Sequence, residues 1–293
     1  MDESIKTRIK NQIFKFEITV DNRINDDSTF TLDYESGRYR QKELVGLIRD
    51  IVPYFALTET ELKELDLSDL YKQSFTRISD ARENVKGDYG ELLLFVILSV
   101  FYNVPKFVTK ARLRSTTKDQ IKGFDCAHFS IDSNSQVTLW LGEAKFYKRI
   151  SNAINSAFNS LNDHLCDPEK IKSELKLLGG NIEINKRLDK ETFDLLKNYV
   201  DGGKSLDNVP IKVPVLLTYN SKCICSFCGK NININDQTFQ EQLGNEINKK
   251  FKLIYSKKWP SISNISIVFF LLPFEDVAYI KKEIRKVEEA MKI

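Results

Sequence analysis

The chain has 293 residues, enough for one large α/β domain or for a domain with a smaller appendage. It carries 44 Lys and Arg residues against 41 Asp and Glu residues, so the net charge of +3 does not mark the whole protein as a nucleic-acid binder. Five cysteines, an odd number, exclude an ordinary secreted disulfide framework. The first residues lack the basic-then-apolar order of a signal peptide, so we expect a cytoplasmic protein.

Residues 1–78 are predicted to form an N-terminal αβ region that covers the rest of the fold and carries no motif. Its expected elements are a strand at Ile13–Val20 that pairs with Phe30–Leu32, a helix at Arg40–Ile51 that ends before Pro53, and a helix at Glu59–Tyr71. Thr58, followed three residues later by Glu61, predicts a capping box for the second helix.

Residues 79–293 are predicted to form the main domain, beginning with a helix from Asp80, capped through Glu83, to Tyr102. From Leu92 to Tyr102 this helix is apolar on all sides, which indicates central burial, but the stretch is too short for the roughly 20 residues of a membrane span. Its conspicuous charge is Glu91, which follows Gly87 and Gly90. Glycine weakens a helix, so we expect a close backbone approach there.

Three strands joined by short polar turns follow: Phe107–Leu113, Gly123–Ile131 and Val137–Tyr147. Short turns predict an antiparallel meander. Asp125 lies in the second strand, where aspartate is disfavoured. Glu143 and Lys145 end the apolar part of the third strand, and because strand side chains alternate, both point to the same side.

The rest of the chain is predicted to contain three helices, two apolar strands and a charged amphipathic helix. In order, these are Arg149–Leu165, Pro168–Leu178, Glu191–Val200, the strands Ile211–Tyr219 and Ile265–Leu272, and the final helix Asp276–Lys292. The expected fold class is α/β, with a sheet flanked by helices.

Glu91, Asp125, Glu143 and Lys145 form the candidate active site. Carboxylates that converge at a sheet edge bind Mg²⁺ or Mn²⁺, which take oxygen ligands and keep several waters. Such an ion stabilises charge on a phosphodiester, and a neighbouring lysine orients the attacking water or stabilises the developing charge. A Glu-x-Lys pair alone is a weak signal, because solvated strands also carry such pairs; the preceding acidic residues strengthen it.

Gly90-Glu91, Gly123-Phe-Asp125 and Gly142-Glu143-Ala-Lys145-Phe resemble the motifs of the PD-(D/E)XK, or restriction-endonuclease-like, nuclease superfamily. The likeness is closest to the HamA family, nuclease subunits of the Hachiman antiphage defence system, and is clearest from Asp80 to the C-terminus. It implies a restriction-endonuclease-like mixed sheet flanked by helices. One departure is that Gly-Phe, not Pro, precedes the motif aspartate.

The resemblance further implies a Mg²⁺-dependent deoxyribonuclease in which Asp125 and Glu143 bind the metal and the Ala144 carbonyl joins them. It makes Lys145 the catalytic lysine and Glu91 a residue that supports the site. It also implies a partner, the helicase HamB, which restrains the nuclease until DNA engages the complex. Two alternatives stay open: a non-catalytic subunit that binds nucleic acid or regulates a helicase, and an unrelated α/β scaffold protein whose acidic residues lie far apart.

Other polar residues have simpler interpretations. Cys223, Cys225 and Cys228 form C-x-C-x-x-C, but a structural zinc site needs four ligands and no fourth is near, so we favour a structural role in which the first two extend the preceding strand. His128 and His164 have no nucleophile pattern around them and are expected to be structural. A basic cluster could contact phosphates without reading sequence: Lys106, Lys110, Arg112, Arg114, Lys118 and Lys122, with Lys148 and Arg149.

Overall fold

The computed structural model describes residues 1–16, 26–78, 88–104, 106–109, 124–132, 136–165, 171, 194, 198 and 209–292. Its helices are α1 (Glu3–Gln12), α2 (Gln41–Ala56), α3 (Glu59–Glu64), α4 (Leu67–Thr76), α5 (Asp88–Phe101), α7 (Ile150–Leu165), α10 (Lys222–Phe227), α11 (Gln237–Tyr255) and α12 (Val277–Met291). Its strands are β1 (Ile13–Phe16), β2 (Ser28–Leu32), β3 (Tyr34–Glu35), β4 (Arg38–Tyr39), β5 (Lys106–Thr109), β6 (Cys126–Ile131), β7 (Val137–Lys145), β8 (Ile211–Asn220) and β9 (Ile265–Phe274).

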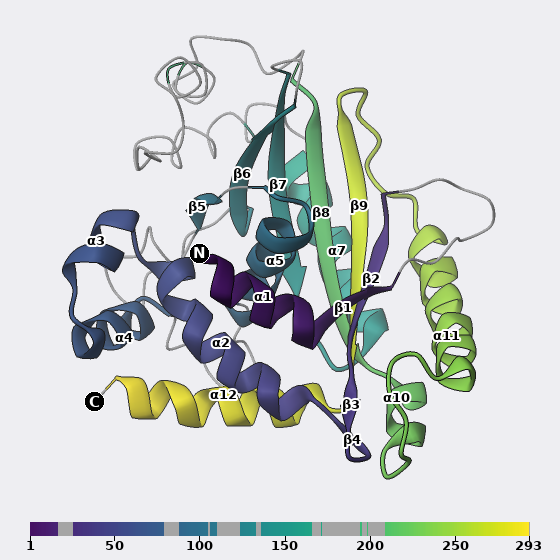
Figure 1. Ribbon diagram of the computed structural model, residues 1–293. Helices are drawn as coiled ribbons and strands as arrows, with labels where there is room; N and C mark the ends of the chain where they lie inside the picture. Colours follow the sequence, from purple (N-terminus) through teal and green to yellow (C-terminus); the bar gives the residue numbers. More distant parts are fainter. Residues whose placement is uncertain are drawn as a thin grey trace.

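A mixed sheet of seven strands, in the order β1-β2-β9-β8-β7-β6-β5, organises the fold (Figure 1). Strands β5, β6 and β7 pair antiparallel, as the short turns between them predicted. Strands β7, β8 and β9 run parallel, so their carboxyl ends lie at one edge of the sheet. The predicted α/β class with a mixed sheet flanked by helices is confirmed.

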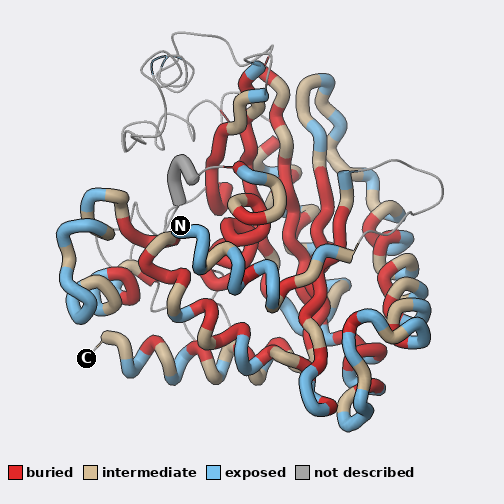
Figure 2. Tube along the Cα trace, viewed as in Figure 1, coloured by how far each residue is buried: buried red, intermediate tan, exposed pale blue. Residues whose placement is uncertain are grey.

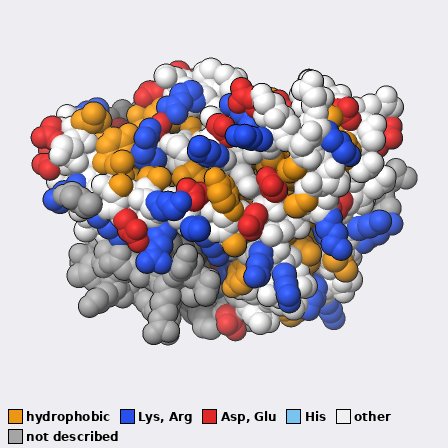
Figure 3. Space-filling model, turned by 90° about the horizontal axis from the view of Figure 1, so that it is seen from below, with side chains coloured by type: hydrophobic (Ala, Val, Ile, Leu, Met, Phe, Trp, Pro, Cys, Tyr) orange, Lys and Arg blue, Asp and Glu red, His pale blue; other side chains and the backbone are white. Residues whose placement is uncertain are grey.

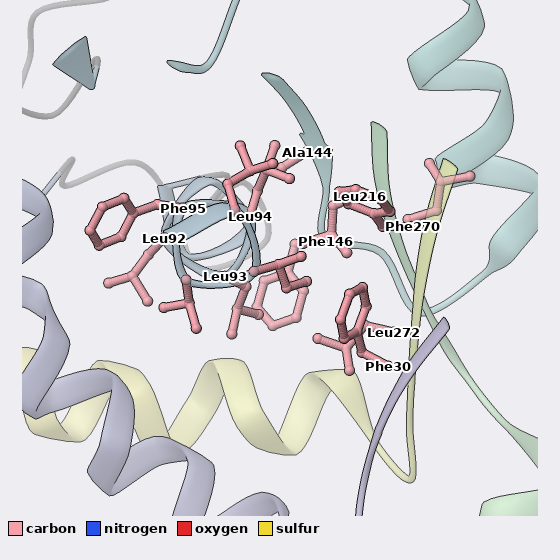
Figure 4. Close-up of a cluster of buried hydrophobic side chains, with 14 of the residues drawn as sticks. Phe30, Leu92, Leu93, Leu94, Phe95, Ala144, Phe146, Leu216, Phe270 and Leu272 are labelled. Carbon is pink, nitrogen blue, oxygen red and sulfur yellow. The ribbon is translucent and has the colours of Figure 1, made fainter. Parts of the chain in front are cut away.

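The parallel strands are buried on both faces, which is why they read as continuous apolar runs (Figure 2). Helix α5 packs on one face against β7, and α7 packs on the other against β7 and β8 (Figure 1). Nearly every residue of α5 is buried, as its all-round apolar sequence predicted. Figure 4 shows Leu92, Leu93, Leu94 and Phe95 leaving this helix in different directions.

The N-terminal strands extend the main sheet. Strand β1 pairs antiparallel with β2, which confirms the predicted pairing, and β2 then runs parallel beside β9. The capping box of α3 is also present: the Thr58 hydroxyl accepts a hydrogen bond from the Glu61 N–H, and the Glu61 carboxylate accepts one from the Thr58 N–H.

Two helix boundaries in this region were predicted wrongly. Helix α2 does not end before Pro53 but continues to Ala56. The proline has no N–H to donate, yet the last turn is held by the burial of Phe55 and by a 2.9 Å hydrogen bond from the Leu57 N–H to the Pro53 carbonyl. The single helix expected from Glu59 is two helices, because Asp66 caps α4 through the Asp69 N–H at 2.9 Å.

Several predictions fall outside the described residues, among them the helix start at Asp80 with Glu83 and the helices Pro168–Leu178 and Glu191–Val200. Helices α7 and α12 and strands β8 and β9 lie where the sequence predicted them. Helices α1, α10 and α11 were not predicted. Within the described part of the chain, no helix has the length and apolar character needed to cross a bilayer.

Candidate active site

The candidate site lies where β7 extends past the end of its pairing with β6. Pairing between these strands ends at Cys126 opposite Gly142, whereas β7 continues beside β8 through Lys145. Among the described strands, Glu143, Ala144 and Lys145 are therefore paired on the β8 side only. Within the described part of the chain, this segment of strand edge has no strand partner, and it contains the Glu-x-Lys motif.

Asp125 occupies this edge just before β6 begins. Its N–H donates a hydrogen bond to the Gly142 carbonyl at 2.9 Å, and its carboxylate accepts one from the Ala144 N–H at 2.7 Å. The Asp125 side chain therefore bonds to β7 just past the last backbone pair between β6 and β7. Asp125 is only 8% exposed. Because the N–H and C=O of one strand residue point to the same side, the Ala144 carbonyl is directed toward this edge as well.

Glu143 and Lys145 form an ion pair through Oε1 and Nζ, and Glu143 is only 1% exposed. Burial lowers the pKa of the Lys145 ammonium, but the nearby charges of Glu143 and Asp125 outweigh it, and the net effect raises the pKa of Lys145 above its ordinary value. The lysine therefore remains a cation at neutral pH. The predicted convergence of Asp125, Glu143 and Lys145 is present in the structure.

Glu91 lies in the first turn of α5, which packs on the face of β7 opposite to α7. A Cβ added at Gly90 would lie 3.2 Å from the Phe146 Cβ and 3.4 Å from the Ala144 Cβ, so this glycine allows the close backbone approach that the sequence predicted. Glu91 is buried, at 5% exposure. Its role in supporting the site remains a prediction; Gly87 and Gly123 lie outside the described residues.

The donor set fits a hard divalent cation. Two buried carboxylates, from Asp125 and Glu143, lie beside the ammonium of Lys145, and carboxylate oxygens are the ligands that a hard divalent cation takes. Among the described residues, no three His, Cys, Asp or Glu side chains group closely enough to hold a metal ion by themselves. A metal here would take oxygens from two carboxylates and the Ala144 carbonyl, and water or phosphate would complete its shell, which is the coordination that Mg²⁺ prefers.

Basic residues follow the site directly. Lys148 and Arg149, immediately after β7, are both exposed. Lys and Arg side chains are also spread over the face on which α12 lies (Figure 3). Of the basic cluster predicted ahead of Asp125, the side chains of Lys106, Lys110, Arg112, Arg114, Lys118 and Lys122 lie outside the described residues.

The three cysteines lie near a different part of the sheet. Cys223 and Cys225 do not extend β8; they lie in α10, because the Ser221 hydroxyl accepts the Ile224 N–H at 3.1 Å and begins a helix there. Burial raises the pKa of the Cys223 thiol to about 12 and that of Cys228 to about 11, the opposite of what a thiolate ligand needs.

The two histidines contact aromatic rings. His128 is fully buried and stacks on Phe95, with ring centroids 6.3 Å apart. His164 lies 5.2 Å from the Phe124 ring, also between centroids. Both have the surroundings of structural residues.

A family model described as HamA matches residues 7–287. The chain belongs to the HamA family. HamA proteins act in Hachiman antiphage defence, so this is an antiphage defence protein. No curated protein matches the chain.

Sequence reasoning missed two features of this HamA-family site. A Cβ at Gly142 would overlap the Cys126 Sγ and lie 2.8 Å from the Leu94 Cδ2, so β6, β7 and α5 pack closely together beside Glu143. The glycine between an apolar run and the Glu-x-Lys pair was the available signal. Tyr147, two residues after Lys145, is exposed next to the site, and strand alternation could have placed it there.

Proposed function

We propose that this HamA-family protein is a Mg²⁺-dependent deoxyribonuclease, an endonuclease that hydrolyses phosphodiester bonds. The observation that carries the proposal is the set of Asp125, Glu143 and Lys145 where β7 extends past β6: two buried carboxylates and a partly buried ammonium. Buried carboxylates beside a partly buried ammonium are costly to maintain in a fold and are typical of functional sites.

In this proposal Asp125 and Glu143 hold Mg²⁺ or Mn²⁺ with the Ala144 carbonyl. When bound, the ion lowers the pKa of a coordinated water and offsets charge on the phosphate. Asp125 uses one oxygen to fix the Ala144 N–H, which keeps that peptide group oriented toward the edge. The arrangement positions the ligands before substrate arrives, so little reorganisation is needed at the moment of reaction.

Lys145 has a separate role. As a cation on the same strand face as Glu143, it stabilises negative charge on the phosphate and orients the attacking water. Glu143 holds the ammonium in place through the ion pair, and Glu91 supports the site from α5. The helicase HamB is the proposed partner, DNA the proposed substrate and the cytoplasm the proposed location.

The test replaces Glu143 and Lys145 separately with Gln and measures degradation of linear and plasmid DNA with Mg²⁺, with and without the helicase. We expect each variant to lose at least about 100-fold in rate, since each removes charge at the reacting phosphate. Glu288→Gln is the matched control, because Glu288 is also a buried glutamate paired with a lysine, Lys292, at 2.9 Å. It should cleave like the wild type.

Calorimetry separates this proposal from a non-catalytic subunit. The wild type should bind Mg²⁺ or Mn²⁺, and Glu143→Gln should bind it more weakly. DNA binding without any affinity for either metal would favour a subunit that binds nucleic acid or regulates the helicase. Unchanged DNA breakdown in both Gln variants would refute the assignment of these residues to the active site.

A further inference from the structure

Tyr147 continues the strand face that carries Glu143 and Lys145. Side chains alternate along β7, and residues 142, 144 and 146 face α5, so residues 143, 145 and 147 face the α7 side. The Tyr147 hydroxyl lies 3.4 Å from the Ser156 Oγ of α7, which agrees with this placement. The ring is therefore a neighbour of the proposed reaction site.

The ring is exposed although its neighbours in β7 are not. Tyr147 is 38% exposed, and among the described residues the other exposed large apolar side chains are Leu67 and Leu253, on α4 and α11. Scattered exposed apolar residues are common on proteins and carry no function. Tyr147 differs because it adjoins a buried charged site, and no aromatic ring of the described residues stacks on it.

The backbone around Tyr147 is held firmly. The Thr218 hydroxyl donates to the Tyr147 carbonyl at 3.1 Å, and the Asn220 N–H donates to the Lys148 carbonyl at 3.0 Å. Because these hydrogen bonds tie the backbone to β8, the position of the ring is restricted before DNA binds. A fixed ring is a favourable binding surface, because ordering a mobile side chain on binding reduces affinity.

We infer that Tyr147 is a stacking platform for an unpaired nucleobase of the DNA strand whose phosphate lies at Lys145. The inference rests on the proposed nuclease function and names its substrate class. An aromatic ring beside exposed cations, here Lys148 and Arg149, is the combination that binds single strands: bases stack on the ring while lysine and arginine contact the backbone.

Stacking selects for unpaired DNA. A base inside a duplex is covered on both faces by its neighbours, so it offers no face to the tyrosine ring unless the helix opens. A single strand, a frayed end or a strand separated by a helicase offers such a face without that cost. The platform therefore predicts that single-stranded or locally opened DNA binds more tightly than an intact blunt duplex.

The test measures binding apart from cleavage. Full-length protein in EDTA is titrated with a fluorescent single-stranded oligonucleotide and with a blunt duplex of the same sequence, by anisotropy. A second oligonucleotide carrying 2-aminopurine reports stacking through quenching of its emission. The variants are Tyr147→Leu and Tyr147→Phe, with Tyr71→Leu on α4 as the control for loss of a partly buried tyrosine ring.

We expect Tyr147→Leu to weaken single-strand binding about tenfold and to abolish the quenching, while duplex binding changes less than about twofold. Tyr147→Phe should behave as the wild type, since it keeps the ring and loses only the hydroxyl. Unchanged single-strand binding by Tyr147→Leu, or an equal loss for both DNA forms, would overturn the inference. The expected pattern in a protein that never cleaves DNA would support the platform and refute the nuclease proposal instead.

Discussion

Replacing Gly142 with Ala tests the packing that places the candidate site. The added Cβ would overlap the Cys126 Sγ and approach the Leu94 Cδ2 to 2.8 Å. Both neighbours are fully buried, and Cys126 belongs to the strand paired with β7, so neither side chain has open space to move into. Overpacking of this kind costs about 1–3 kcal/mol, which corresponds to a melting temperature lower by about 2–5 °C in a chain of 293 residues.

The assay is urea unfolding followed by circular dichroism, with a double-mutant cycle. Cys126→Ala alone should cost about 1 kcal/mol through lost packing. Combined with Gly142→Ala it removes the overlap with Sγ, so the double variant should be more stable than the sum of the single effects by at least about 1 kcal/mol. Gly46→Ala is the matched control: no atom lies within 4 Å of its added Cβ, and a helix interior favours alanine by about 0.5–1 kcal/mol.

Strictly additive effects of Gly142→Ala and Cys126→Ala on the free energy of unfolding would refute this packing.

The same variants should also change DNA breakdown. Gly142 adjoins Glu143, and Cys126 adjoins Asp125, so forcing the strands apart should separate the two proposed metal ligands. DNA breakdown should fall in Gly142→Ala and recover in part in the double variant.

Two further predictions concern pH. Burial raises the pKa of Asp27 from 3.8 to about 6. The stability that Asp27 contributes is therefore full below pH 3.8 and is lost as the pH rises through 6. In urea unfolding across pH 4–8, Asp27→Asn should be more stable than the wild type above pH 6, by up to about 3 kcal/mol, and should show no such gain below pH 4. Although burial opposes it, the Arg77 guanidinium helps lower the pKa of Glu61 to about 2. This pair therefore stabilises the fold above pH 4.5, and the stabilisation is lost as the pH falls through 2. Because solvent screens the pair, Arg77→Gln should lose about 1 kcal/mol at pH 7 and less at pH 2, and an equal loss at both pH values would contradict the prediction.

The meander and the Glu-x-Lys strand were predictable because their signals are local. Polar turns between apolar strands dictate antiparallel pairing, and alternation alone places Glu143 and Lys145 on one face. The register that sets Cys126 opposite Gly142 is not local. It depends on packing across strands and against Leu94, so the sequence did not show that Asp125 would bond to the Ala144 N–H.

The errors in the prediction have physical causes of the same kind. Pro53 reads as a helix end, yet burial of the last turn of α2 outweighs one lost hydrogen bond. Helix α11 was missed although its buried residues Phe239, Leu243, Ile247 and Phe251 recur every four positions. That apolar stripe is narrow and lies in a polar stretch, where helical periodicity is easily overlooked.

The length difference between β6 and β7 explains why the candidate site lies where it does. Strand β6 has six residues and β7 has nine, and the last three residues of β7 are Glu143, Ala144 and Lys145. A strand edge that continues past its neighbour leaves backbone groups to be satisfied, and Asp125 satisfies one of them with a carboxylate. The same carboxylate lies close to Glu143 and Lys145. The hydrogen bond that completes the sheet therefore also holds Asp125 where the proposed metal site requires a carboxylate ligand.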